Sequence, residues 1–103
     1  MIYIKKHATP QGLLLAMCDE ELLGKVFASG KMQLDLDKYA DFYRGELVAE
    51  AQASDGTSGE DIYSANIVGE RAVAVMLNRG MVKKADVKMV GRVPFVQIFK
   101  MDL

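Results

Sequence analysis

Apolar residues dominate the stretch from Asn66 to Gly80, which predicts a helix with almost no polar face. On a wheel of 3.6 residues per turn they surround most of the axis, with Val68, Ala72, Val75 and Met76 on one side and Ile67, Val73, Ala74 and Leu77 on the other. Such a helix is normally buried, so we expect a central helix over about 66–79, with the first four of these residues almost wholly buried. Asn66 is expected to cap its N-terminus, and Gly80 to end it.

The first twenty residues predict a β-hairpin. Ile2 and Ile4 occupy alternate positions, as in a strand with one buried face. A turn is expected within residues 8–11, which contain Pro10. The run over residues 13–17 is continuously apolar, which is typical of a strand at the centre of a sheet.

Short elements are expected further along the chain. Asp19 is expected to cap one helical turn over residues 20–23. A second hairpin is expected around residues 28–31, followed by a strand in which Met32, Leu34 and Leu36 face inward. Late strands are expected over residues 87–90 and 95–99.

The segment over residues 46–53 fits either a strand or a helix, and we favour a strand that continues into a loop. Residues 54–59, Ser-Asp-Gly-Thr-Ser-Gly, predict that loop, and a short helix is expected over about 59–65. Together these elements predict one α+β domain over residues 1–103, with a mostly antiparallel sheet packed on one buried central helix.

The counts of reactive residues exclude much chemistry. Cys18 is the only cysteine and His7 the only histidine. An intrachain disulfide is therefore impossible, which fits a reducing, cytoplasmic compartment. With residues 8–11 as the loop, these two residues are expected about 20 Å apart along the hairpin, too far to share zinc or to act as nucleophile and base.

The sequence contains no P-loop and no Gly-x-Ser-x-Gly, His-Glu-x-x-His or Cys-x-x-Cys motif. We therefore expect no catalytic residues, no cofactor and no bound metal, and we favour a protein that is not an enzyme. No apolar run approaches the roughly 20 residues that cross a bilayer, so no membrane partner is expected.

Charge is distributed unevenly along the chain, although its net charge is only −1. Residues 71–103 hold seven basic residues against two acidic ones, a net charge of +5. A bipolar surface would offer one pole to an anionic partner, either RNA or an acidic protein. The candidate contacts are Arg71, Lys83, Lys84, Lys88 and Arg92.

The segment Asn66–Arg71 is the most suggestive for binding, because helix N-termini bind anions. Asn66, Gly69 and Arg71 are candidate anion-binding residues, and Gly69 suggests the close approach of a ligand or a backbone. Glu70 opposes an anion at the same place. The alternative is a capped helix that packs through Gly69, with Glu70 and Arg71 in ion pairs.

Two other clusters have a structural explanation that we favour. The acids at positions 19–21 could contribute to a cation site, but acids in a first turn usually serve the helix dipole. Tyr39, Phe42, Tyr43 and Arg44 could stack on single-stranded nucleic acid, but aromatic residues at this spacing are usually core.

Four segments together resemble one protein family: residues 18–25 (CDEELLGK), 42–46 (FYRGE), 65–73 (ANIVGERAV) and 91–94 (GRVP). They are similar to the archaeal family called domain of unknown function 424, in that family's order and over nearly the whole chain. The resemblance implies an archaeal, cytoplasmic protein with a loose link to translation genes, and it implies no activity and no site. Phe95 and Val96 depart from the family, where His and Ala are frequent.

Three functions stay open. We favour a binding module for RNA or the translation machinery that uses the basic C-terminal third. The alternative is a protein–protein adaptor or a homodimer with no nucleic-acid role. A carboxylate enzyme that uses Glu70 ranks third.

Overall fold

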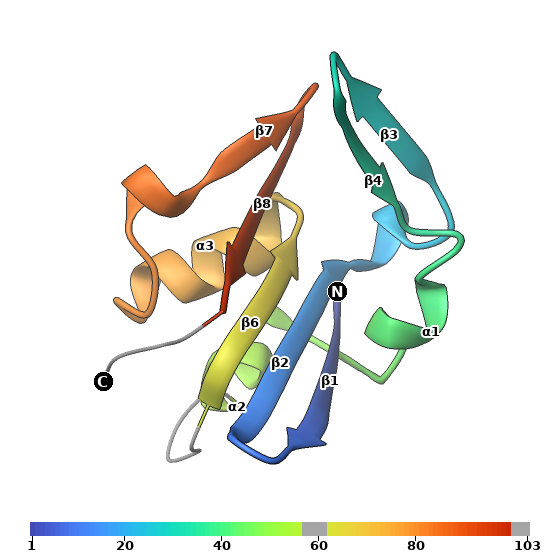
Figure 1. Cartoon of the computed structure of the whole chain (residues 1–103). Coiled ribbons are helices and arrows are strands. Elements are labelled where there is room, and N and C mark those ends of the chain that lie inside the picture. The colour runs from blue at the N-terminus through green and yellow to red at the C-terminus, as the bar shows by residue number, and fades with distance from the viewer. Residues whose placement is uncertain (57–61, 100–103) are drawn as a thin grey trace.

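The computed structural model describes residues 1–56 and 62–99. Its main element is a six-stranded sheet in the order β5-β1-β2-β6-β8-β7 (Figure 1). The strands are β1 Ile2–Thr9, β2 Gly12–Asp19, β5 Glu46–Val48, β6 Ile62–Val68, β7 Lys88–Val90 and β8 Val93–Ile98. All neighbours are antiparallel except β2 and β6, which run parallel at the centre.

A separate two-stranded hairpin, β3 Val26–Ser29 and β4 Met32–Asp35, lies over one face of this sheet. The helices are α1 Ala40–Tyr43, α2 Glu50–Gly56 and α3 Glu70–Asn78, with 3-10 turns η1 Glu20–Leu22 and η2 Lys84–Asp86. Because β2 alternates between two buried faces, the sheet carries two cores. Helices α2 and α3 cover one face, and the β3–β4 hairpin with α1 covers part of the other (Figure 1).

The predicted fold class is confirmed: the protein has an α+β fold with a mostly antiparallel sheet and a buried helix. Val68, Ala72, Val75 and Met76 are all buried, as expected. The strand that contains residues 13–17 is central, as its continuous apolar pattern predicted.

The predicted bounds of the central helix, 66–79, are wrong at the start. Residues 66–68 end strand β6, and α3 begins only at Glu70. Strand β6 carries apolar residues on both faces because each face of the sheet packs against a core, so its residues imitate a buried helix on the wheel. The short helix expected over 59–65 is also wrong from Ile62 onward, where the chain is strand, and residues 59–61 lie outside the described part.

The ambiguous segment 46–53 divides between two elements. A strand is correct for β5, but helix α2 then begins at Glu50, where we favoured a loop. The Gln52 side chain accepts a hydrogen bond from the N–H of Ala49, which places a cap at the start of this helix (3.1 Å). Of the predicted loop 54–59, residues 54–56 belong to α2 and the rest lie outside the described residues.

The β1–β2 hairpin is confirmed, but its register differs from the expected one. Thr9 pairs with Gly12, so that His7 pairs with Leu14 and Tyr3 with Cys18. In the described ranges, 1–56 and 62–99, no helix has the length and apolar character required to cross a membrane.

Candidate functional site

The carboxylate of Asp19 occupies the N-terminus of α3. Its two oxygens accept hydrogen bonds from the N–H groups of Arg71 (3.0 Å) and Ala72 (2.9 Å). Asp19 is only 2% exposed, and burial raises the pKa of its carboxyl, while these two hydrogen bonds act in the opposite direction. Asp19 stands at the predicted N-cap position of η1, but its side chain makes no capping hydrogen bond there. The prediction that Asn66 caps the helix is wrong, because Asn66 lies in β6.

Gly69 permits this arrangement. Its backbone has φ +108° and ψ 155°, a conformation that is almost restricted to glycine. A Cβ at this position would collide with the carboxyl of Asp19. The sequence correctly indicated a close approach at Gly69, but the approaching group is a carboxylate of the protein itself. The two N–H groups that an anion would use are therefore already bonded.

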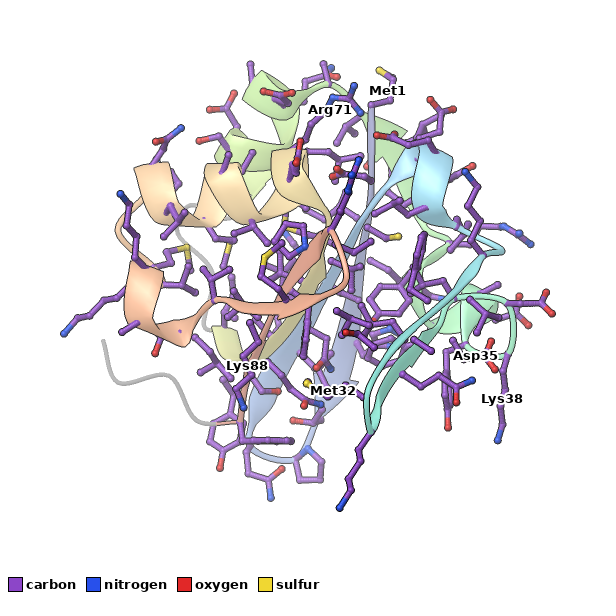
Figure 2. All side chains as sticks on the ribbon, turned by 90° about the horizontal axis from the view of Figure 1, so that it is seen from above. Met1, Met32, Asp35, Lys38, Arg71 and Lys88 are labelled. Atoms are coloured by element: carbon purple, nitrogen blue, oxygen red, sulfur yellow. The ribbon has the colours of Figure 1, made fainter. Side chains whose placement is uncertain are left out.

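The candidate basic residues do not form a single patch. Arg71 lies in the first turn of α3, where its guanidinium bonds to Glu21 and lies 3.7 Å from Glu50. Lys83 and Lys84 follow the opposite end of that helix. Lys88 is on edge strand β7 and Arg92 is in the β7–β8 turn. Figure 2 shows Arg71 and Lys88 on opposite sides of the molecule.

The environments of Cys18 and His7 do not favour nucleophilic chemistry. Cys18 is buried, and this burial raises the pKa of its thiol to about 12. The Nε2 of His7 bonds to the carbonyl oxygen of Phe42 (2.9 Å), and the two rings stack at 4.6 Å. Four ladder positions separate His7 from Cys18, which is about 13 Å along the hairpin rather than the expected 20 Å. Among residues 1–56 and 62–99, no three His, Cys, Asp or Glu side chains form a group that could hold a metal.

The aromatic cluster is mostly structural, as we favoured. Tyr43 is buried in the second core, which is the core between the sheet and the β3–β4 hairpin and also contains Cys18. Phe42 packs edge-on against Tyr43 with ring centroids 5.0 Å apart. Tyr39 differs, because it is 54% exposed. The ammonium of Lys38 lies 5.5 Å from the centre of its ring.

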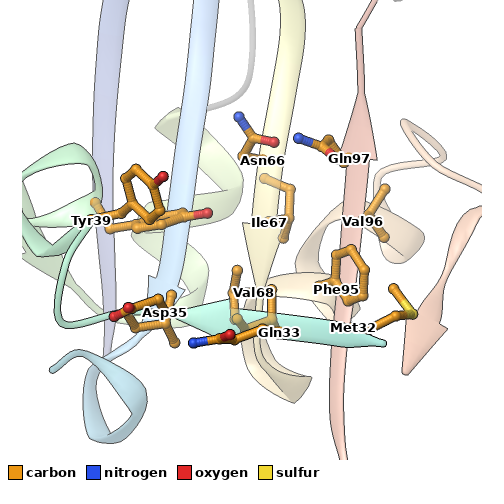
Figure 3. A pocket seen from close by; sticks show the side chains of 13 residues that line it. Met32, Gln33, Asp35, Tyr39, Asn66, Ile67, Val68, Phe95, Val96 and Gln97 are labelled. Atoms are coloured by element: carbon orange, nitrogen blue, oxygen red, sulfur yellow. The ribbon is translucent and has the colours of Figure 1, made fainter. Parts of the chain in front are cut away.

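A cleft of about 350 Å³ separates the β3–β4 hairpin from the sheet. One wall is β4, with Tyr39 and Tyr43 beside it, and the floor is formed by residues 66–68 of β6 and 95–97 of β8. The floor is accessible because the hairpin and α1 cover only part of this face (Figure 3).

Amide and aromatic side chains define the chemistry of this cleft. Asn66 and Gln97 are partners in the β6–β8 ladder, so their amides stand side by side on the floor (Figure 3). Phe95 and Tyr39 add aromatic surface. Asp35 is the only charged residue in the described lining, and its carboxylate accepts hydrogen bonds from the N–H groups of Asp37 and Lys38. The cleft therefore suits a ligand with uncharged polar groups.

A model of a family of proteins of unknown function, DUF424, matches residues 7–101. The chain belongs to the DUF424 family. The fold is similar to the crystal structure of an uncharacterized conserved protein from the archaeon Methanopyrus kandleri, which is 25% identical. That match has a TM-score of 0.78 and covers 99% of this chain and 93% of the other. No curated protein matches this DUF424 chain.

The cleft was missed in the sequence, although its residues carried a signal. Asn66 and Gln97 are amides inside otherwise apolar strands, and a strand face that is fully covered rarely carries them. The sequence pattern predicts Asn66 at a helix N-terminus, whereas in this DUF424 protein its side chain lies on the cleft floor.

Proposed function

We propose that this DUF424 protein is a non-catalytic adaptor that binds a segment of another polypeptide in the cleft between the β3–β4 hairpin and strands β6 and β8. The observation that carries the proposal is the composition of the lining. Paired amides, aromatic rings and a single charged group match the mixture of peptide groups and side chains that a polypeptide presents.

The electrostatics of the cleft favour polypeptide over RNA. Asp35, its charged lining residue, would repel phosphates. Arg71 already pairs with Glu21, and the other candidate bases are distributed over separate elements. Binding of RNA through Lys83, Lys84, Lys88 and Arg92 is a competing proposal, which rests on the exposure of these residues. A homodimer is a further alternative.

The test begins with selection from a random peptide library displayed on phage, followed by titration of the selected synthetic peptides. Gln97→Arg places a long cationic side chain on the cleft floor, and Gln11→Arg makes the same exchange in the exposed β1–β2 turn. We expect the first variant to lose peptide binding and the second to retain it. Selection of no peptide, or equal affinity of the two variants, would overturn the proposal.

The RNA alternative is tested in parallel with a structured RNA at two salt concentrations. Affinity that falls by about 0.7–0.9 log units per log unit of salt for each phosphate contacted is the signature of phosphate binding. If the triple variant Lys83→Ala/Lys84→Ala/Arg92→Ala loses this binding and no peptide binds, the RNA proposal replaces the adaptor.

A further inference from the structure

The hydrogen bonds of the β3–β4 hairpin fix the direction of each backbone group on β4. In an antiparallel ladder, bonded and non-bonded pairs alternate. The N–H of Leu36 donates to the carbonyl oxygen of Lys25 (2.8 Å), so these two residues form a bonded pair. Continuing the register, Phe27 with Leu34 is also a bonded pair, whereas the pairs on either side of it, Val26 with Asp35 and Ala28 with Gln33, are not.

Gln33 therefore directs its N–H and C=O away from β3, toward the free edge of β4. Asp35 has the same orientation, and its C=O accepts a hydrogen bond from the N–H of Tyr39 (3.3 Å). This edge faces the cleft, because all the residues from Met32 to Leu36 line it in succession. On this wall of the cleft, Gln33 thus directs one backbone donor and one backbone acceptor outward, while the outward C=O of Asp35 is already bonded to Tyr39.

We propose that the polypeptide bound in the cleft is an extended segment that adds to the free edge of β4 as a third strand of the hairpin. The inference rests on the proposed function and adds the binding mode. An added strand would satisfy the outward Gln33 groups and alternate its side chains between the cleft floor and solvent. Exposed Met32 and Tyr39 stand at opposite ends of this edge (Figure 3).

The floor sets the chemistry of the inward side chains. A residue opposite Asn66 and Gln97 would be uncharged and would carry a hydrogen-bonding group, since both amides offer donors and acceptors. A neighbouring inward position would be apolar, because it would rest against Phe95. Acidic residues would be excluded by the proximity of Asp35.

A segment of another polypeptide fits the free edge of β4 better than a second copy of this chain does. Lys31 and Lys38 flank β4 on either side, and lysines next to an edge oppose pairing between identical edges. A single added strand needs only the spacing between neighbouring strands, about 4.8 Å, whereas a second copy would bring its whole hairpin and sheet into a cleft of about 350 Å³.

The test uses proline at two matched positions. Gln33→Pro removes an N–H that faces the cleft, and Ala28→Pro removes one from its ladder partner, which faces the outer edge of β3. Neither N–H belongs to the β3–β4 ladder, so both variants are expected to fold, with similar circular dichroism and melting curves. For a selected peptide, Gln33→Pro should weaken binding about three- to tenfold, and Ala28→Pro should not.

Hydrogen exchange supplies an independent readout on the unmodified protein. The Gln33 amide should exchange freely without peptide and slow markedly when the peptide is added. The Leu34 amide, bonded within the hairpin, should be protected in both states.

The outcomes separate the two proposals. If Gln97→Arg abolishes peptide binding while Gln33→Pro and Gln33 exchange are unaffected, strand addition is overturned and the adaptor proposal stands. If no peptide binds, both are overturned. A dimer that forms at increasing protein concentration and is lost in Gln33→Pro would assign the edge to a second copy and overturn the inference.

Discussion

The carboxyl group of Asp19 lies where a side chain at position 69 would have to be. Asp19 ends β2, and Gly69 joins β6 to α3; the two strands run parallel and end at the same edge of the sheet. This juxtaposition lets one carboxylate bond to two N–H groups at the start of α3.

Gly69→Ala should destabilise the protein more than Gly80→Ala. Both glycines have positive φ, so both variants carry backbone strain, and the strain is larger at Gly69, whose φ of +108° with ψ of 155° is almost restricted to glycine. Only at position 69 does the new Cβ also collide with Asp19, because Gly80 has open space around it. Urea unfolding of the two variants measures the sum of the larger strain and the collision, and equal losses would contradict both.

The contribution of Asp19 to stability should decrease as the pH rises. Burial raises the pKa of this carboxyl in the folded state, so the folded protein holds its proton to a higher pH than the unfolded chain. The free energy of unfolding of the wild type, relative to Asp19→Asn, should therefore fall from about pH 4 up through the raised pKa. Denaturation at several pH values tests this, with exposed Asp37→Asn as the control for loss of one charge. A constant difference would contradict it.

Met76→Ala should lower the melting temperature by about 8 °C or more. Met76 is a fully buried residue of α3, and truncation of such a side chain costs about 2–5 kcal/mol. Met89→Ala is the matched control, because Met89 is 52% exposed on edge strand β7. Coincident melting curves of the Met76 variant and the wild type would refute the assignment of α3 to the core.

Cys18 should be inert toward thiol reagents in the folded protein. With a pKa of about 12, roughly one thiol in ten thousand is ionised at pH 8, and the side chain is buried as well. Ellman's reagent should report no free thiol until guanidinium unfolds the chain, and then one per molecule. Rapid labelling of the native protein would show that the second core opens.

Local patterns in the sequence were sufficient for the fold class and for the elements with a clear period. The alternation of Ile2 and Ile4 and the continuous run over 13–17 predicted β1 and β2 correctly. The predicted start of α3 was wrong because Ile67 and Val68 are buried for a different reason, since they point into the two cores on opposite faces of the sheet. Periodicity alone does not distinguish a buried strand from a buried helix.

The site required information that no local pattern contains. Nothing near Asp19 indicates that its acceptor oxygens serve a helix that begins at Glu70, because that contact depends on the parallel pairing of β2 with β6. The cleft has the same origin, since its wall and floor come from β4, β6 and β8. The sequence identified Asn66 and Gly69 as unusual, and only the tertiary structure assigns their roles.

The acceptor that caps α3 is encoded 53 residues before the Ala72 N–H that it serves. A nine-residue helix is too short to persist alone in water, so α3 depends on the finished β2–β6 pair for both its cap and its packing. During synthesis, the N-terminal half would emerge with β2 lacking its central neighbour, and the helix would form only once β6 had docked. The domain should consequently fold late and in a single step, and it should not survive division at the segment between α2 and β6.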